Sequence, residues 1–429
     1  MRRYPYVFLI FVLFLFISFN KVTAEETLTW QDCIKEAAKN HPDLIAAQES
    51  VKESEAAKQI SASTLFPQVN SNLSAATART ASGNGDTATH KTADSYSYGV
   101  TGSQLLFDGL KTINNVNAAK ENIKASQQGY RFTSSEVRLR LRTAFVNLLR
   151  AQELVHVTED IATIRRGNFE LITLRYESGL EHKGALLTAE ANLAQANFEI
   201  AQAKREIELT QRQMTKEMGR TEFSPLSVKA DFKVIDSAKE KPDFETLVKT
   251  NPSLQQLIAQ KNAAGFGLKS TYANFFPTLS GQAGANKAGS CWFPQNDQWN
   301  LGLTVSLPIF EGGLRLAQVS QAKALFNQLQ ANERSTRDGI IVTLAQAWVD
   351  LQDAIETVEV QYKSLVAAQE RAKIAEAQYS TGFITYDNWS IIEDNLVRAK
   401  TDYLNAESNA LLAEASWIQA KGETLEYAQ

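Results

Sequence analysis

Apolar and polar residues alternate along one segment in the second half of the chain, WNLGLTVSLPIF. One side of this segment carries Trp299, Leu301, Leu303, Val305, Leu307 and Ile309. The other side carries Asn300, Gly302, Thr304, Ser306 and Pro308. A period of two predicts a β-strand with one apolar face. The segment YSYGVTGSQLLF, residues 96–107, alternates in the same way but less cleanly.

A second apolar pattern, with steps of three and four residues, predicts long helices. In the second half it comprises Ile341, Leu344, Trp348, Leu351, Ile355, Val358, Tyr362 and Leu365. A shorter counterpart in the first half comprises Val137, Leu141, Ala144, Leu148, Ala151 and Val155. Such a heptad seam is typical of a coiled coil. No proline interrupts either seam, and about 65 residues at ~1.5 Å each predict a rod on the order of 100 Å.

Each predicted rod ends at a tyrosine and a glycine. The two segments are YESGLEH, with Tyr176 and Gly179, and YSTGFIT, with Tyr379 and Gly382. Glycine is the usual residue just past a helix C-terminus, because it adopts a positive φ without steric cost. A second helix should then return along each rod, as far as Gly219 in the first half and Gly422 in the second.

The two halves of the chain are repeats of each other. From Gly99 onward the matching positions lie 203 residues apart, as in the pairs Gly99 and Gly302 or Lys120 and Lys323. Upstream the separation is 210 residues, because Phe66 matches Phe276. The difference falls in the polar segment TARTASGNGDTATHKTADS, which predicts a loop. A tandem duplication therefore determines the architecture.

Each repeat turns from strand to helix at a corner that contains an acid and glycine. The corner residues are Phe107, Asp108 and Gly109 in the first repeat and Phe310, Glu311, Gly312 and Gly313 in the second. A carboxylate ahead of a helix N-terminus is favoured by the helix dipole and the free N–H groups. The matching helix-to-strand junctions are Phe66 with Pro67 and Phe276 with Pro277, because proline cannot continue a helix and restricts the residue before it.

These signals divide the chain into five parts. Residues 1–24 predict a signal peptide, since Arg2 and Arg3 precede an apolar segment that ends at the cleavage site Val22-Thr23-Ala24. The first repeat covers 25–220, with a helix over 29–64, strands at about 66–77 and 95–107, and a long helical hairpin. Residues 221–242 form a linker with some short extended structure. The second repeat covers 243–422, with a helix over 243–274, strands at about 276–287 and 298–310, and a hairpin, before a tail of 423–429.

Composition and charge exclude several classes of function. The 44 Lys+Arg residues against 48 Asp+Glu leave no basic surplus, so we expect no nucleic acid partner. Cys33 lies in a helical segment and Cys291 in a polar loop of the other half, which predicts two free thiols. The histidines lack metal-ligand spacing and are expected at ordinary surface positions: His41, His90, His156 and His182. With no Gly-rich phosphate loop either, we expect no cofactor, no metal and no enzymatic activity.

Strands of about ten residues have the length that crosses a membrane. Four such strands per chain cannot close into a barrel, and lipid does not tolerate an open sheet edge. Barrels begin at about eight strands, so membrane strands would require several chains to share one barrel. For the lipid face we choose the side that carries Trp299, Leu301, Leu303 and Val305.

In the order and duplication of these motifs, the chain resembles the TolC-like outer-membrane efflux proteins, or outer membrane factors. The resemblance covers essentially everything after the signal peptide. It implies a mostly α fold with a membrane β-barrel part, in which a homotrimer forms one 12-stranded barrel in outer-membrane lipid on a long periplasmic α-barrel. It also implies passive export of drugs or proteins, driven by an inner-membrane RND or ABC pump through a periplasmic adaptor protein.

An alternative from another class is a periplasmic coiled-coil protein, structural or adaptor-like, without a membrane barrel. Heptads alone would favour it, but the alternating strand at 299–309 and the strand pairs at equivalent points of both halves argue against it. The sequence does not name a substrate, and it leaves drug efflux and type I protein secretion both open.

The resemblance also implies two functional regions. The helix tips, with Tyr176, Gly179, Tyr379 and Gly382, correspond to the family's periplasmic end, where adaptors dock; capping and packing are their structural roles. Acidic residues after the second tip would ring a closed entrance, and here the candidates are Asp387, Glu393 and Asp394. Their spacing departs from the family pattern, and the first repeat has Gly184 in place of Asp387. A ring of three carboxylates and a solvated surface acid both stay open.

Overall fold

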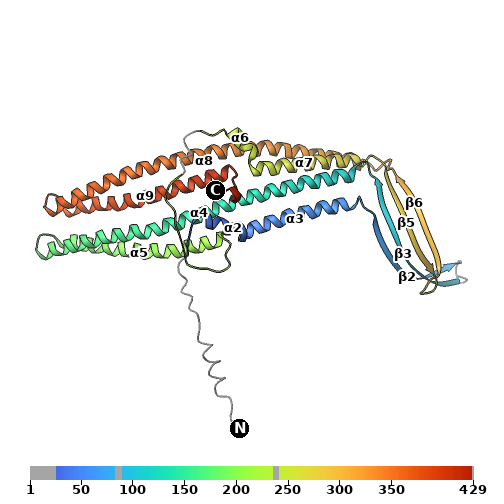
Figure 1. The fold of residues 1–429 in the computed structure, drawn as a ribbon, viewed down its shortest axis with the longest axis horizontal. Helices are drawn as coiled ribbons and strands as arrows, with labels where there is room; N and C mark the ends of the chain where they lie inside the picture. The colour runs from blue at the N-terminus through green and yellow to red at the C-terminus, as the bar shows by residue number, and fades with distance from the viewer. Residues whose placement is uncertain (1–25, 83–88, 235–240, 428–429) are drawn as a thin grey trace, which may run out of the picture.

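The molecule is a long helical rod with a β-sheet attached at one end (Figure 1). This computed structural model describes residues 26–82, 89–234 and 241–427. The predicted signal peptide, 1–24, lies outside the described residues. No helix in the described ranges is both long enough and apolar enough to cross a membrane.

Four helices make up the half of the rod away from the sheet. They are α4 (Lys111–Glu177) with α5 (Lys183–Glu217), and α8 (Leu314–Ser380) with α9 (Tyr386–Ala420). The long helices have 67 residues each and the return helices 35 each. Helix α8 begins and ends 203 residues after α4, and α9 begins and ends 203 residues after α5, which is the separation found in the sequence. The duplication and the rod length of about 100 Å are therefore confirmed.

The helix predicted at the start of each repeat is in fact two helices. The first repeat has α2 (Trp30–Asn40) and α3 (Pro42–Ser63), and the second has α6 (Phe244–Thr250) and α7 (Pro252–Ala273). Each break comes directly before a proline, which occupies the first turn of the following helix, where its missing N–H costs no hydrogen bond. The expectation of one continuous helix over 29–64 or 243–274 was wrong.

His41 occupies the first of these breaks, and the expected surface position was wrong for this histidine. Its side chain is only 5% exposed. Nδ1 accepts a hydrogen bond from the backbone N–H of Asp43 at 3.2 Å, while Nε2 lies 3.5 Å from a carboxylate oxygen of Glu217. His41 therefore caps α3 and ties it to the end of α5.

The sheet has four antiparallel strands in the order β2-β3-β5-β6, so its central pair joins the two repeats. The strands are β2 (Gln68–Ser82), β3 (Thr89–Phe107), β5 (Thr278–Gly289) and β6 (Asn296–Ser306). The expected bounds were wrong in the first repeat, where both strands extend into the segment that was read as a polar loop. Cross-strand hydrogen bonds extend this polar hairpin, since Thr77 Oγ1 donates to Asp94 at 2.7 Å and the hydroxyls of Ser74 and Ser97 lie 2.9 Å apart.

The middle of the rod is organised around the linker. β1 (Glu26–Leu28) pairs in parallel with β4 (Leu226–Val228), which confirms short extended structure within 221–242. Both strands pack on a core that includes Cys33, Leu141, Phe145 and Met214. The short helix η3 (Leu425–Tyr427) brings Leu425 of the tail into the same core. Cys33 is buried and Cys291 is exposed, and neither forms a disulfide.

Candidate functional site

The sheet has one apolar and one polar face, and its register decides which residues share each face. Trp299 lies opposite Ala285, and Leu301, Leu303 and Val305 follow on the same side of β6. These four side chains are 67–80% exposed. Across the strands this face continues through Leu73, Tyr98, Val100, Ala283, Ala285 and Leu279. A contiguous exposed apolar surface of this kind marks contact with lipid or protein.

The opposite face is polar and uncharged where all four strands pair. Thr101, for example, lies between Asn70 on β2 and Gly284 on β5, and Gly284 lies opposite Asn300 on β6. Serine, threonine, asparagine, glutamine, glycine and alanine make up this face from Ser97 to Ser103 and on the residues opposite. Apolar-out and polar-in alternation is the pattern of a membrane β-barrel with an aqueous interior.

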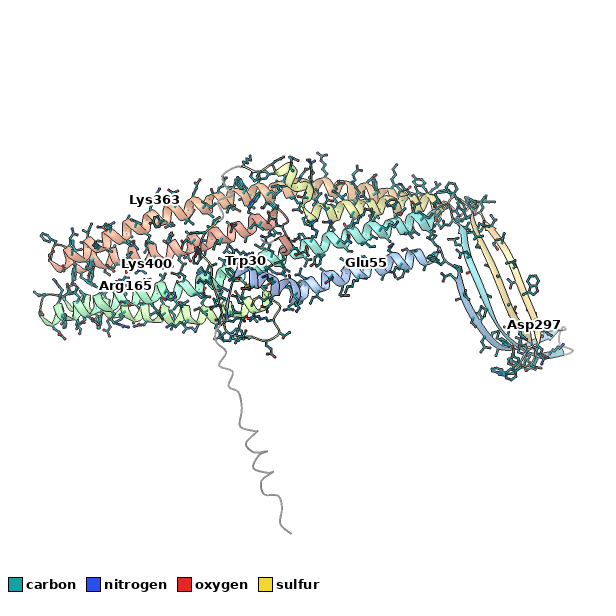
Figure 2. The ribbon with its side chains drawn as sticks, in the orientation of Figure 1. Trp30, Glu55, Arg165, Asp297, Lys363 and Lys400 are labelled. Carbon is teal, nitrogen blue, oxygen red and sulfur yellow. The ribbon has the colours of Figure 1, made fainter. Side chains whose placement is uncertain are left out.

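Both ends of the apolar face have distinct chemistry. At the end far from the helices, Lys287 and Asp297 form an ion pair of 3.1 Å, and Figure 2 places Asp297 at that end of the sheet. At the helical end a β-bulge between Leu105 and Phe107 shifts the register. The bulge sets Phe107 opposite Leu279 and therefore on the apolar face.

The corner of the first repeat is built as expected. A carboxylate oxygen of Asp108 accepts hydrogen bonds from the backbone N–H of Thr112 at 2.8 Å and from its hydroxyl at 2.5 Å. Gly109 has φ +67°, and a Cβ there would lie 2.7 Å from Cβ of Phe276. The strands β2 and β5 begin directly after Pro67 and Pro277, so the helix-to-strand junctions are confirmed.

At the second corner the acidic residue does not have the predicted role at the helix N-terminus. The Glu311 carboxylate does not cap α8; it accepts a hydrogen bond from Nε of Arg315 at 2.8 Å. The residue before α8 is Gly313, with φ +87°, and Gly312 has φ +60°. Both corners therefore turn through two consecutive left-handed residues, and the second of these is Leu110, at φ +70°, in the first repeat.

Both helix tips end in the same capping motif. Gly179 donates its N–H to the carbonyl of Tyr176 at 3.0 Å, and Leu180 donates to Arg175 at 2.8 Å. Gly382 and Phe383 repeat these bonds at the end of α8. Both glycines have positive φ, and this pair of bonds defines the Schellman motif. The predicted capping role of Gly179 and Gly382 is therefore confirmed.

The two tip tyrosines have different surroundings. Tyr176 is 38% exposed, whereas Tyr379 is 2% exposed. The ring of Tyr379 stacks on Trp389 with centroids 4.5 Å apart, and the Arg175 guanidinium lies 4.8 Å from its centroid. Its hydroxyl donates a hydrogen bond to Glu181 at 2.7 Å. Burial and this carboxylate raise the pKa of Tyr379. Tyr379 thus joins the tip of the second repeat to that of the first.

The three candidate acids lie in three different environments. Asp387 is exposed in the first turn of α9. Glu393 is 5% exposed, and burial raises the pKa of its carboxyl, while one of its oxygens has no hydrogen-bond partner among the described residues. Asp394 accepts a hydrogen bond of 2.5 Å from Arg165 of α4, which lies in the half of the rod away from the sheet (Figure 2). Within one chain these acids form no cluster that could hold a metal ion.

The residues that organise the tip were not predicted from the sequence: Trp389, Tyr386, Glu181, Arg175 and Arg165. Trp389 is 1% exposed and contacts both Tyr379 and Tyr386. A signal for it was present, because Tyr386, Trp389 and Glu393 follow the three- and four-residue spacing of one helix face. No sequence signal connected Glu181 to Tyr379, since the two lie 198 residues apart.

Comparison with known proteins identifies the family. The sequence model of the outer membrane efflux protein family matches residues 33–220 and 245–423. The chain belongs to this family. It is 22% identical to outer membrane efflux protein BepC of Brucella suis over 76% of its own length and 69% of that protein. It is 23% identical to outer membrane protein TolC of Escherichia coli over 66% of its length, and the match spans 61% of TolC.

Solved structures support the same fold. The chain superposes on the open state of the MtrE outer membrane channel of Neisseria gonorrhoeae with a TM-score of 0.80 and 17% identity, covering 92% of this chain and 89% of that one. The TolC-like fold class, with a helical periplasmic part and a β-barrel part in the outer membrane, is therefore confirmed. The protein is an outer-membrane protein with a large periplasmic part.

Proposed function

We propose that three copies of this chain form one export channel, a 12-stranded outer-membrane barrel continued by a periplasmic α-barrel. It would give passive exit to drugs or proteins that an inner-membrane RND or ABC pump delivers through a periplasmic adaptor. The observation that carries this proposal is the open sheet with two chemically different faces. Its apolar face and its two unpaired edges, β2 and β6, require further copies before the sheet can lie in lipid.

The uncharged polar face supports an aqueous lumen. Residues such as Thr101, Asn286 and Asn300 can hydrogen-bond to water, and they carry no charge that would select ions by sign. A wide passage with this lining suits chemically diverse cargo. The apolar face, with Leu301 and Leu303 near its middle, would then contact the hydrocarbon core.

The helix tips support a role as the periplasmic end, because they lie farthest from the sheet (Figure 1). Exposed Tyr176 and the two capping glycines, Gly179 and Gly382, would present the adaptor-docking surface. Buried Tyr379 would instead hold the tips of the two repeats together through Glu181. Opening of the entrance would have to break or move this link.

Fractionation and conductance test the proposal together. The mature protein should sediment with the outer membrane and migrate on unheated SDS gels as a trimer that heating dissociates. The purified trimer should give stable conductance steps in a planar bilayer. A monomeric protein in the periplasmic fraction would instead support the alternative of a coiled-coil protein without a barrel.

For the closed entrance we propose Asp387 as the ring-forming acid. Glu393 is buried and Asp394 is paired with Arg165, whereas exposed Asp387 forms no ion pair within the described part of the chain. Threefold symmetry would bring three Asp387 carboxylates near the axis, where they would repel one another and attract cations.

Asp387→Asn should therefore abolish block by divalent or polyvalent cations added from the periplasmic side. The change removes three charges with little change of shape, so the trimer should still assemble. Bilayer recordings with and without added cation measure the effect. Glu370→Gln, which neutralises an exposed acid on α8, should leave the block intact. Equal block in Asp387→Asn and the unmodified protein would assign Asp387 to the solvated surface.

A further inference from the structure

Helix α7 carries an aromatic groove on its surface close to the sheet. We propose that this groove binds a periplasmic polypeptide that is anchored by lipid in the inner leaflet of the outer membrane. The bound segment would present apolar side chains to the rings of the groove and an acidic side chain to its lysine. The aromatic groove is lined by Phe266, Leu268, Lys269 and Tyr272 of α7, Glu121 of α4 and Phe326 of α8.

The aromatic groove lies within the width of one copy of the chain. The half of the rod next to the sheet consists of α3, α4, α7 and α8 (Figure 1). These helices follow the order of the strands, because α3 contacts α4, α4 contacts α7, and α7 contacts α8. The groove passes over α7, between Glu121 of α4 and Phe326 of α8. It is therefore distinct from the free edges β2 and β6, where further copies would join.

A second groove follows the opposite side of α7. The residues that α7 contributes to this second groove include Ala264, Gly267, Thr271 and Asn274. Those that α7 contributes to the aromatic groove include Asn262, Gly265, Lys269 and Tyr272. Both sets step by three and four residues, and they are offset by two residues. Two residues correspond to about 200° around a helix, so the two grooves lie on opposite sides of α7.

The second groove faces the lumen of the proposed channel. It shares Lys111, Asn274 and Gln318 with a cavity that reaches the end of the sheet. There the cavity is lined by Thr278 and Ser306, which pair with each other on the polar face. The aromatic groove, on the other side of α7, therefore faces the periplasm. This step rests on the proposed function, because it takes the polar face of the sheet as the lumen.

Aromatic rings form the floor and the walls of the groove. A Cβ at Gly265 would lie 3.4 Å from the ring of Phe326, so glycine lets this ring lie close to the backbone of α7. Phe266 and Phe326 are half-buried, and Tyr272 is 49% exposed. The groove has a volume of about 570 Å³. An exposed apolar surface with polar residues at its rim is typical of an interaction site.

The first repeat shows that the fold does not require these rings. Helix α3 is the counterpart of α7, and both have 22 residues. In place of Phe266 and Tyr272, α3 has Ala56 and Ala62, 210 residues earlier. The same helix therefore forms with small side chains at these positions. The rings of the second repeat are then explained by a partner rather than by the rod itself.

Lys269 gives the rim of the groove a positive charge. Its ammonium lies 5.0 Å from the centroid of the Phe266 ring, and the residue is exposed. The acid on the opposite side, Glu121, is neutralised by Lys124 at 2.6 Å. Lys269 has no such ion pair among the residues that the structure describes. An acidic side chain of the partner would complement it.

The position of the groove along the rod indicates a partner that leaves the membrane. Helix α7 ends at Ala273, so Tyr272 lies in its last turn. Gly265, which contacts Phe326, lies eight residues before Ala273, or ~12 Å along the helix. The headgroup layer of a bilayer is only about 5–8 Å thick on each side. Lipid headgroups would therefore reach Tyr272 but not Phe326, whereas a polypeptide that runs from the inner leaflet along the rod would contact both.

Photocrosslinking in living cells tests this proposal. The crosslinker p-benzoylphenylalanine is placed at Tyr272 or, as the matched control, at Ala62 in the first repeat. Cells are fed radiolabelled palmitate, so that lipid-anchored proteins carry the label. Irradiation should attach a labelled protein at Tyr272 and raise the mass of the heated chain. At Ala62 the yield of this adduct should be roughly fivefold lower.

Two substitutions make the groove resemble the first repeat. Lys269→Gln and Phe266→Ala introduce the side chains that α3 has at Gln59 and Ala56, so α7 should still form and the trimer should assemble. Each should lower the yield of the labelled adduct roughly fivefold. Lys111→Gln is the control, because this exposed lysine belongs to the luminal groove. It should leave the yield unchanged.

The outcomes separate the groove from the proposed channel. A labelled adduct that requires Lys269 and Phe266, with a protein that fractionates with the outer membrane, supports the proposal. Label without a gain in protein mass would identify a phospholipid. That result, an unlabelled adduct, or an adduct with an inner-membrane protein or a second copy of this chain overturns the proposal. Absence of any adduct at Tyr272, or an equal yield at Ala62, overturns it too. The heat-sensitive trimer on the same gels tests the channel separately.

Discussion

Replacing Trp389 by alanine should destabilise the helix tips by about 3–5 kcal/mol, the usual cost of removing a large buried aromatic side chain. Trp389 is 1% exposed and lies in a cluster with Ile172 of α4, Ala185 of α5 and Tyr379 of α8. Its loss would leave a cavity between the two hairpins and free the ring of Tyr379. Limited proteolysis of the detergent-solubilised trimer should show cleavage near the tips at a temperature where the unmodified protein resists.

Two further variants make this prediction specific. Trp389→Phe should cost only about 1 kcal/mol, because it keeps a stacked ring and removes an indole N–H that has no hydrogen-bond partner among the described residues. Phe383→Ala, at an 83% exposed position on the same tip, should have almost no effect. The trimer itself should persist in all three, since the sheet lies at the opposite end of the rod (Figure 1). Equal protease resistance of Trp389→Ala would show that the cluster does not hold the tips together.

The helices and strands could be predicted from the sequence because the motifs that bound them are local and occur in both repeats. Proline after phenylalanine ends a helix, and glycine after tyrosine caps one, whatever the rest of the chain does. The strand β6 is recognised by the alternation of apolar and polar residues along it. The separations of 210 and 203 residues then relate each element to its counterpart in the other repeat, so a segment with a weak pattern can be assigned from one with a strong pattern.

The missed features depend on contacts between distant segments. His41 looked like a surface residue because nothing nearby in sequence indicates that Glu217 packs against it. The outer part of the β2–β3 hairpin was read as a loop because its residues beyond Thr77 show no apolar alternation, and cross-strand pairing such as Thr77 with Asp94 extends the strands there. Alternation reveals a strand only where one face is apolar.

The positions of the helix tips could be predicted from the sequence, but the side-chain contacts between them could not. The repeats agree at the capping glycines, but the counterpart of Trp389 is Leu186 and the counterpart of Glu181 is Ile384. The aromatic stack and the Tyr379–Glu181 hydrogen bond therefore exist once per chain. Duplication transfers a scaffold faithfully, but it gives no information where the repeats have diverged.

Replacing Leu303 by arginine should destabilise the assembled barrel by about 2–4 kcal/mol, the cost of a basic side chain on the lipid face near the bilayer midplane. Leu303 is 73% exposed in the single chain and lies near the middle of the row from Trp299 to Val305 and beyond. An arginine there is too far from either interface for its guanidinium to reach water without cost.

Thr304→Arg is the matched control, one residue away and on the opposite face. Its guanidinium would extend into the aqueous lumen and keep its hydration, so the trimer should dissociate at nearly the unmodified temperature on SDS gels. The Leu303→Arg trimer should dissociate at a clearly lower temperature or fail to accumulate in the outer membrane. The two variants add the same side chain to the same strand, so their difference isolates the environment of each face. A stronger effect at Thr304 would place lipid on the polar side and reverse the assignment of the two faces.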